Sequence, residues 1–506
     1  MFIPALVALL LLSCTGCWDR KELNQISACT MIGFDRVVRN GKPLILMSVL
    51  SLKLNAGLSG GGAGGGAGGG ATTYPPSLGV INSAEGETVG DALRNMSLRS
   101  PKAIFLGHVE VVIIGEDMAR NGIQQVIDFC GRNKEIRYRI DMAVCQGSAL
   151  EALESQPEFE TLNSVEALKI IRSSSSRSSK AVPANLFQVV YALLTPGKDV
   201  AMPRMVVFLP PERGSTIRKG APSGASEESG KQGGGAQGQQ GSTGGAQGGG
   251  AQGQQAQQGS TGLQGVGAQG QQEQFVQLSQ QGRQGITGAQ SGGTQGGDFN
   301  QALGAQEALH PDWKAMAVDG SAVFLGDRLV GWLNENESMG AMFITKQAAG
   351  GEIPFAFRSS EPNATYIFRS VHASVKPVVG NGSITYEISL KGSGELAEDK
   401  NAAIDVMSES DIRAAEQLID AEVAGRCQDA VATCQSLKSD VFGFGDLLHK
   451  SDPAFWRQIN DRWRDYFPNV KVQVHADFTI EQAGAIGEAI KISKTVSSPP
   501  SRADIF

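Results

Sequence analysis

Histidine, aromatic residues and short catalytic motifs are scarce in this sequence of 506 residues. No two of its five histidines have the spacing of a metal-binding pair, and the sequence contains no HExxH, CxxC, GxSxG or P-loop motif. His108 lies in a buried-strand pattern, where a core or strand-edge histidine is expected more often than a catalytic one. No pair of carboxylates stands out either. We therefore expect no enzyme, no metal site and no cofactor, because a hydrolase would need a constellation that is missing here.

Cysteine is also sparse, with seven residues in the chain. Five of them follow position 17, and an odd, scattered set of this kind is not a disulfide framework. Cys427 and Cys434 are seven residues apart in a helical pattern, which separates their Cα atoms by about 10 Å. A disulfide needs less than about 7 Å, so we expect both to be small core residues.

Positive charge and aromatic side chains are too few for nucleic-acid recognition. The net charge is −7 and aromatic residues make up 6% of the chain. A mildly acidic chain has no general basic face for phosphates, and few rings are present on which bases could stack. We therefore expect no nucleic-acid partner.

Glycine, in contrast, is abundant but concentrated in two tracts. Of 65 glycines, nine lie in residues 60–70 and 25 lie in residues 221–298. We expect a disordered Gly/Ala loop at 57–72 and a disordered Gly/Gln-rich linker at 221–309, because neither tract can bury enough apolar surface to fold. A GxGxxG match at 265–270 lies inside the second tract, without the strand and helix that a nucleotide site requires.

The first residues have the pattern of a bacterial lipoprotein signal. Residues 3–12 form an uncharged apolar run, which as a helix would span about 15 Å and is too short to cross a bilayer. Small residues then lead to Cys17. We expect residues 1–16 to be a signal peptide and Cys17 to carry S-diacylglycerol and an N-acyl group, with membrane lipid as its partner. Cys14 is a rival acceptor, and a plain secretory signal with incidental cysteines is the alternative.

No other run in the chain approaches the 18 apolar residues that a membrane span needs, so we expect the rest to be a soluble body outside the cytoplasm. Its patterns include both strands and helices, and its length indicates two or three domains. Residues 17–220 form the expected N-terminal α+β region. Its predicted strands are 26–34, 44–54, 105–115 and 138–145, and its predicted helices are 87–97, 121–131, 164–172, 184–194 and one near Leu150. Asn40-Gly41 predicts a hairpin turn, and the serine-rich stretch 172–180 predicts a loop.

The second half begins with an expected middle β-rich domain at 310–369. Its hairpin at 320–333 could instead complete the N-terminal sheet, with 339–345 continuing the strands. A C-terminal α+β domain is expected at 370–490, followed by a disordered tail at 491–506. It has a hairpin at 371–390, a long helix at 408–437, a helix at 453–466 and a strand at 470–480. Ser408 and Asp411 predict a capping box, and the alternation around His475 predicts that this side chain faces solvent.

Two aromatic residues alternate with glycines at Phe442-Gly443-Phe444-Gly445. This pattern suits a tight turn with the rings packed beneath it, because glycine tolerates turn geometry. A ligand-binding loop is the functional alternative.

Four stretches together resemble the Ger(x)C spore germination proteins. The first is the segment CWDRKEL at 17–23, directly after the signal; the second is GHVEVVIIGE at 107–116, followed by Asp128-Phe129 and Glu135-Ile136-Arg137. The third is the stretch 320–331, and the fourth is QSLKSDVFGFG at 435–445, followed by Pro453, Trp456, Trp463 and Phe467-Pro468. They cover about 330 residues in the order found in the family.

This resemblance implies a fold of three α+β domains, each with a mixed or antiparallel sheet flanked by helices. It also implies a lipoprotein on the outer leaflet of the spore inner membrane, with lipid on Cys17. The expected partners are a membrane A subunit and a transporter-like membrane B subunit of a nutrient germinant receptor. The resemblance brings no catalytic residues. A stand-alone extracytoplasmic solute-binding lipoprotein, with ligand held in a cleft between domains, is the alternative function.

Overall fold

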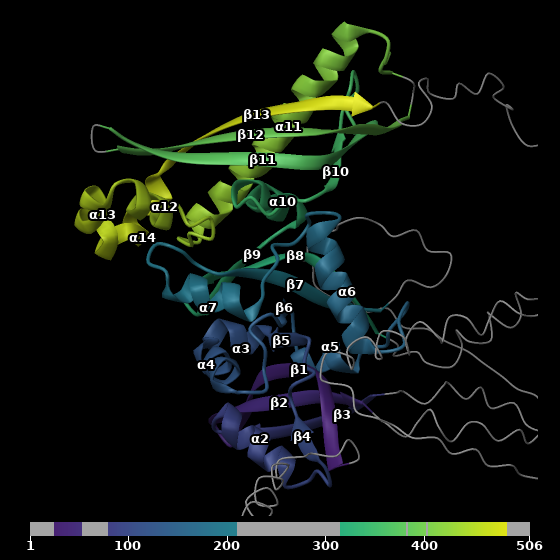
Figure 1. The fold of residues 1–506 in the computed structure, drawn as a ribbon, viewed down its shortest axis with the longest axis vertical. Helices are drawn as coiled ribbons and strands as arrows, with labels where there is room; N and C mark the ends of the chain where they lie inside the picture. The colour runs from purple at the N-terminus through teal and green to yellow at the C-terminus, as the bar shows by residue number, and fades with distance from the viewer. Residues whose placement is uncertain (1–24, 53–78, 210–313, 381–382, 401–402, 483–506) are drawn as a thin grey trace, which may run out of the picture. The chain divides into compact units, whose positions relative to one another are not determined.

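The computed structural model describes residues 25–52, 79–209, 314–380, 383–400 and 403–482. These ranges contain both helices and strands, and the chain has an α+β fold (Figure 1). The described strands form two sheets, one of nine strands and one of four. The expected signal peptide, both glycine-rich tracts and the tail from 491 lie outside the described residues.

The nine-stranded sheet has the order β3-β2-β1-β5-β6-β7-β8-β9, with the short β4 also paired to β1. The strands β1, β5, β6 and β7 are parallel, whereas the outer pairs are antiparallel. The strands are β1 (Ile26–Arg39), β2 (Lys42–Leu52), β3 (Gly79–Gly86), β4 (Ala103–Phe105), β5 (Val111–Gly115), β6 (Asp141–Cys145), β7 (Ala201–Phe208), β8 (Ala315–Leu325) and β9 (Arg328–Leu333).

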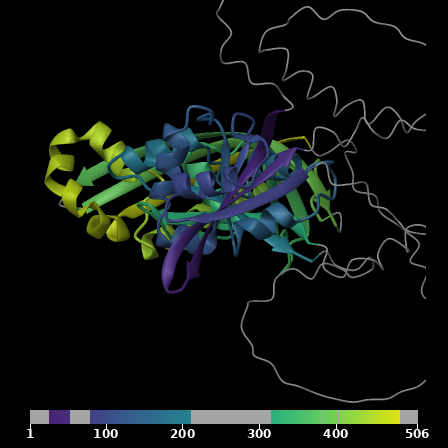
Figure 2. The same cartoon turned by 90° about the horizontal axis from the view of Figure 1, so that it is seen from below.

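Two helical layers cover the two faces of this sheet, because side chains of its central strands are apolar in both directions. One layer consists of α2 (Val89–Ser97), α3 (Glu116–Asn121), α4 (Gln124–Arg132) and α7 (Leu186–Leu194). The opposite layer consists of α5 (Ala149–Glu154) and α6 (Asn163–Ser176). Figure 2 shows the N-terminal strands in purple among these helices.

The four-stranded sheet has the order β10-β11-β12-β13, with β12 and β13 parallel. Its strands are β10 (Gly351–Phe355), β11 (Ala364–Gly380), β12 (Ser383–Asp399) and β13 (Lys471–Gln482). The long helix α11 (Glu409–Ser436) and α10 (Glu335–Ile344) pack on one face of this sheet and share one core with it. His475 lies on the other face and is exposed, as the alternation predicts.

The remaining short helices follow α11 along the chain. They are α12 (Phe444–Ser451), α13 (Pro453–Ile459) and α14 (Trp463–Tyr466), with single 3₁₀ turns at Asn460–Arg462 and Phe467–Asn469. The sequence predicts one continuous helix over 453–466, and this prediction is wrong because the 3₁₀ turn at Asn460–Arg462 interrupts it.

Several local predictions are confirmed. Asn40 and Gly41 both have positive φ, 52° and 78°, at the turn that pairs Arg39 with Lys42. The helix predicted at 408–437 is α11, and Ser408 caps it by accepting a hydrogen bond from the backbone N–H of Asp411. The hairpin predicted at 320–333 consists of β8 and β9, which extend the N-terminal sheet through β7. The rest of the 310–369 range contributes α10, β10 and the start of β11.

Three other predictions are wrong for local reasons. Residues 105–115 are not one strand, because β4 and β5 pair with β1 on either side of a bulge between Cys29 and Met31. Residues 339–345 are not a strand, because a capping box between Asn334 and Glu337 starts α10. The serine-rich loop begins only after Ser176, because α6 continues to that residue; within it, the hydroxyls of Ser175 and Ser176 donate to carbonyls one turn earlier.

Candidate functional site: the junction around Asp440

The segment 435–445, which carries the strongest resemblance, follows α11 and lies where the two sheets meet. It contacts the loop before β7 and the turn between β8 and β9. We call this region the Asp440 junction. Its members are Gly197, Asp199, Gly326, Ser439, Asp440, Phe444, Gly445 and Trp463.

Asp440 is the centre of the junction, with only 2% of its surface exposed. Its Oδ1 accepts a hydrogen bond from the backbone N–H of Phe444 at 3.0 Å. Its Oδ2 accepts one from the N–H of Gly445 at 2.8 Å and one from Nε1 of Trp463 at 3.0 Å. The carboxylate therefore starts α12 and ties it to α14, as a buried acceptor of three N–H groups.

Asp199 belongs to the other side of the junction and is also buried. Its backbone N–H donates to the carbonyl of Asp440 at 2.8 Å, and the N–H of Asp440 donates to Oδ2 of Asp199 at 2.9 Å. The second carboxylate oxygen accepts from the N–H of Gly326, at 2.8 Å, in the turn between β8 and β9. Asp199 thus joins three chain segments through backbone groups.

Burial has the largest effect on the pKa of both aspartates. It raises the pKa of Asp440 to about 7, although the three N–H donors act in the opposite direction, and the nearby charge of Asp199 adds to the rise. Burial also raises the pKa of Asp199, against the effect of the N–H groups of Gly326 and Asp440.

Two glycines allow the segments to approach this closely. A Cβ on Gly445 would lie 2.6 Å from the Cα of Gly197 and 2.8 Å from Nε1 of Trp463. Gly197 has a positive φ of 72°, and a Cβ there would lie 2.6 Å from Cη2 of Trp456. Both positions therefore exclude any larger residue without a backbone shift.

The aromatic residues of the segment pack beneath the turn. The ring of Phe444 is fully buried and stacks on Tyr386 of β12, with centroids 4.2 Å apart. Phe442 stacks on Phe444 at 5.1 Å, and the hydroxyl of Tyr386 donates to the carbonyl of Phe444 at 2.6 Å. The prediction of packing at 442–445 is confirmed, and these rings are core rather than the lining of a ligand loop.

The junction can couple the two sheets mechanically but offers no reactive group. Its carboxylates are occupied by N–H donors, and Ser439 donates its hydroxyl to the carbonyl of Phe324 at 2.5 Å. Within the described ranges, no group of three or more His, Cys, Asp or Glu side chains could hold a metal ion. The sequence pattern identifies the segment 435–445 but not Asp199. The only sequence signal for Asp199 is that it is an acidic residue between Pro196-Gly197 and a buried strand.

His108 and the cysteines within the described residues have the burial and contacts of structural residues. Cys427 and Cys434 are fully buried, and burial raises the pKa of the Cys427 thiol to about 12. Such thiols stay protonated and unreactive. His108 is half-buried, and its ring contacts Phe105 edge-on with centroids 5.5 Å apart. Burial lowers its pKa.

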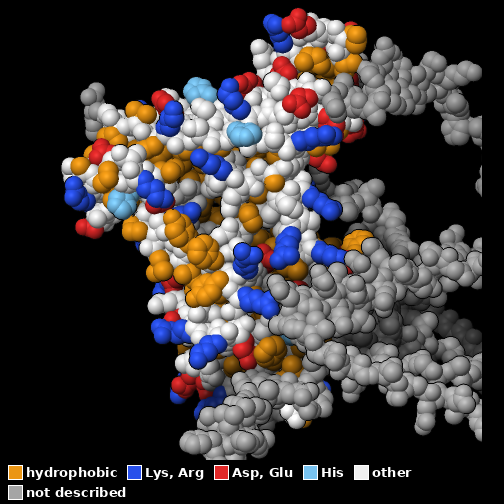
Figure 3. Space-filling model, viewed as in Figure 1, with side chains coloured by type: hydrophobic (Ala, Val, Ile, Leu, Met, Phe, Trp, Pro, Cys, Tyr) orange, Lys and Arg blue, Asp and Glu red, His pale blue; other side chains and the backbone are white. Residues whose placement is uncertain are grey.

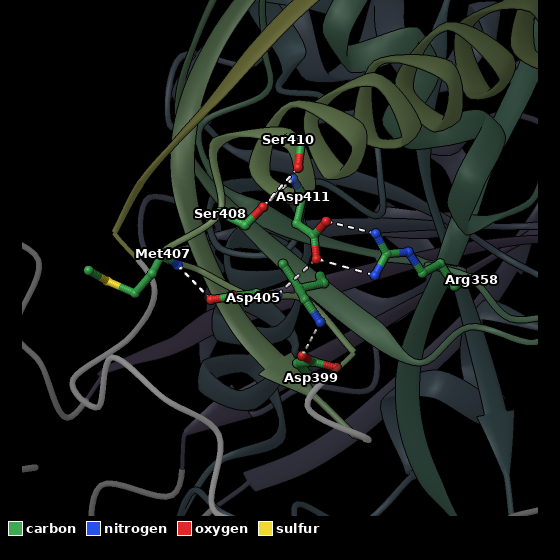
Figure 4. A network of polar contacts seen from close by, with 8 residues as sticks. Arg358, Asp399, Asp405, Met407, Ser408, Ser410 and Asp411 are labelled. Carbon is green, nitrogen blue, oxygen red and sulfur yellow. Dashed lines mark hydrogen bonds and ion pairs between the residues drawn. The ribbon is translucent and has the colours of Figure 1, made fainter.

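A second polar network holds the start of α11 (Figure 4). The guanidinium of Arg358 contacts both carboxylate oxygens of Asp411, at 3.3 and 2.7 Å. One of these oxygens also accepts from the N–H of Asp405 at 3.2 Å. The predicted capping box is therefore only half formed, because Asp411 binds Arg358 and Asp405. The network fixes the start of α11.

Two shallow hollows of the described surface bear on ligand binding. The larger, of about 450 Å³, lies between α2 and α4, is open to solvent, and is lined by apolar Val89 and Phe129 together with polar residues such as Gln125, Asp128 and Arg132. The smaller, of about 350 Å³, lies on α11 beside Arg413. Ligand sites are usually enclosed and mostly apolar, so neither hollow resembles the interdomain cleft that a solute-binding protein requires.

The predicted lipidation site, Cys17, and its rival Cys14 lie outside the described residues. Within the described part of the chain, no helix is both long enough and apolar enough to cross a membrane.

Two family models match the chain in order. Residues 19–207 match the spore germination protein N-terminal domain, and residues 319–484 match the C-terminal domain described as spore germination B3/GerAC like. Between them they contain every member of the Asp440 junction. The gap between the two matches includes the glycine-rich tract at 221–298.

Individual relatives agree with this assignment. Spore germination protein KC of Bacillus subtilis (strain 168) is 21% identical over 97% of this chain and 97% of its own length. Spore germination protein YndF of the same strain is 24% identical over 34% of this chain, and the chain spans only 43% of that relative. The crystal structure of the GerBC protein covers 92% of this chain and 100% of its own, at 14% identity and a TM-score of 0.45.

The family-model matches and the full-length similarity to protein KC agree with the resemblance seen in the sequence alone. The chain belongs to the Ger(x)C family of spore germination proteins.

Proposed function

We propose that this protein is the lipid-anchored, non-enzymatic C subunit of a spore nutrient germinant receptor. The observation that carries the proposal is the pair of family-model matches, which place spore germination domains on both sides of the glycine-rich tract. The chain acts in germination together with a membrane A subunit and a transporter-like membrane B subunit.

The construction of the Asp440 junction supports a non-enzymatic role. The polar and aromatic groups of residues 435–445, which give the family resemblance, form hydrogen bonds and ring contacts that join the two sheets. A catalytic site keeps its reactive groups accessible to substrate, whereas Asp440 is fully enclosed. We infer that the segment maintains a fixed relation between the parts of the subunit that meet its partners.

The anchor is the second part of the proposal. Lipid on Cys17 holds the chain on the outer leaflet of the spore inner membrane, and more than one acyl chain makes such anchoring stable. The test is fractionation of membranes from cells that express Cys17→Ala or Cys14→Ala. Loss of Cys17 alone should release the protein from the membrane fraction. If Cys17→Ala stays in the membrane fraction while Cys14→Ala is released, the lipid is attached to Cys14 instead.

A further inference from the structure

Cations and exposed apolar side chains gather at the end of the first sheet where β1 begins. We call this surface the basic end. It comprises Leu98, Lys102, Lys134, Arg137, Tyr138 and Arg139.

Backbone contacts make the basic end continuous. Ile26, at the start of β1, pairs with Ala103 of β4, which directly follows Lys102. The N–H of Leu106, just after β4, donates to Oε2 of Glu135 at 2.8 Å. That bond holds the 133–139 loop against the end of β4, beside the first residues of β1.

The charge of this surface is opposite to that of the whole chain. Residues 98–102 and 132–139 contain six Lys or Arg and one acidic residue, whereas the chain carries a net charge of −7. Arg137 lies near Glu110 and lowers the pKa of that carboxyl, against the larger rise that burial causes. Four cations have no ion-pair partner among the residues that the structure describes: Lys102, Lys134, Arg137 and Arg139.

Apolar side chains project among these cations. Leu98 is 80% exposed and Tyr138 is 48% exposed. Phe187 of α7, which is 60% exposed, lies close to Tyr138, since its N–H donates to the carbonyl of Tyr138 at 2.9 Å. Figure 3 shows hydrophobic side chains gathered over α7, where Tyr191 and Leu194 are also exposed. Cations mixed with exposed aromatic and aliphatic groups suit the headgroup region of a bilayer.

The chain length before β1 limits how far this surface can lie from an anchor. Gln25, the first described residue, is eight positions after Cys17 in the sequence. A fully extended chain of that length spans at most about 28 Å. Lipid on Cys17 would therefore keep the start of β1, and with it the basic end, within that distance of the membrane.

We propose that the basic end binds the anionic phospholipid headgroups of the membrane that carries the anchor. The proposal rests on the anchoring of Cys17 proposed above and adds a second, electrostatic contact. Anionic lipid attracts each exposed Lys or Arg separately, so it matches a set of cations that have no geometrically fixed partners. Leu98 and Tyr138 then enter the interface between headgroups and acyl chains.

The test is the binding of the unacylated mature chain to lipid vesicles. The chain from residue 17, with Cys17→Ser, keeps every residue that the structure describes. It should sediment with vesicles of phosphatidylcholine and phosphatidylglycerol at least tenfold more strongly than with phosphatidylcholine alone, at low ionic strength. Replacing the four cations of the basic end by Gln (K102Q, K134Q, R137Q and R139Q) should remove most of that difference.

A control variant with the same change in charge checks that location matters. It replaces four exposed cations of the second sheet and its flanking helices: R369Q, K376Q, R457Q and K471Q. This control should bind the anionic vesicles like the parent chain. Thermal melting verifies that both variants are folded.

Three outcomes would overturn the lipid contact. The parent chain could fail to distinguish the two vesicle types, or both quadruple variants could lose binding equally. The third outcome is that the basic-end variant still binds vesicles but no longer co-purifies with membrane proteins, which would make the basic end a protein-docking surface. Because the chain is unacylated in the vesicle assay, its failure leaves the anchor intact, and release of Cys17→Ala decides the anchor separately.

Discussion

Asp199 and Asp440 hold each other through two reciprocal hydrogen bonds. The N–H of Asp199 donates to the carbonyl of Asp440 at 2.8 Å, and the N–H of Asp440 donates to the carboxylate of Asp199 at 2.9 Å. One residue precedes β7 of the nine-stranded sheet, and the other follows α11, which covers the four-stranded sheet. A pair 241 positions apart in the sequence thus joins the two halves of the subunit.

Asp440→Ala should destabilise the protein by about 3 kcal/mol, because three buried N–H groups lose their acceptor. The measurement is the free energy of unfolding in denaturant, or the midpoint of thermal melting. Asp429→Ala is the matched control, since Asp429 is an exposed acid on α11 and should change stability by less than about 0.5 kcal/mol. Equal stability of the two variants would show that the junction is not a source of stability.

The contribution of Asp440 should also depend on pH. Burial raises its pKa to about 7, above the ordinary value near 4, so folding favours the protonated form. The stability from this group is complete below that ordinary value and is lost as the pH rises through 7. Asp440→Asn cannot titrate, so the melting temperature of the parent should fall relative to that of the variant as the pH rises from 5 to 8. A melting temperature of the parent that rises relative to the variant over this range would contradict the raised pKa.

Two glycine substitutions should have opposite effects. Gly445→Ala places a Cβ against Gly197 and Trp463 and should cost about 2 kcal/mol. Gly425→Ala lies inside α11, where an added Cβ meets nothing within 4 Å, and should stabilise the protein by about 0.5–1 kcal/mol. Comparison of their melting temperatures measures how tightly the segments approach. The close packing at 445 would be refuted if Gly445→Ala were as stable as the parent.

Deletion of 223–298 should leave thermal stability almost unchanged, because the composition of this tract cannot supply a core. Differential scanning calorimetry of the deletion variant and the parent is the measurement. A fall of many degrees would show that the tract contributes folded structure.

The sequence predicts local elements well and long-range pairing poorly. The Asn40-Gly41 hairpin and α11 are predicted because their signals lie within the elements themselves. The division of 105–115 into β4 and β5 depends on a bulge in β1, which is distant in sequence. The helix at α10 is missed because the buried, apolar stretch 339–344 conceals the 3.6-residue period.

The candidate site shows the same limit. Gly445 and Phe444 could be singled out from their local pattern, and the prediction of packing there is confirmed. The role of Asp440 depends on Trp463 and on Asp199, which only the tertiary fold brings together. Such a long-range contact leaves no periodic pattern in the local sequence, so Asp199 could not be found from the sequence.

Purification of the tagged protein from solubilised spore inner membranes decides whether it is a receptor subunit. One A-type membrane subunit and one transporter-like B-type subunit should co-purify with it after cross-linking, and Asp440→Ala should reduce their recovery. Recovery of the protein alone, with a bound small solute and without either membrane subunit, would contradict the receptor role and favour a stand-alone solute-binding lipoprotein.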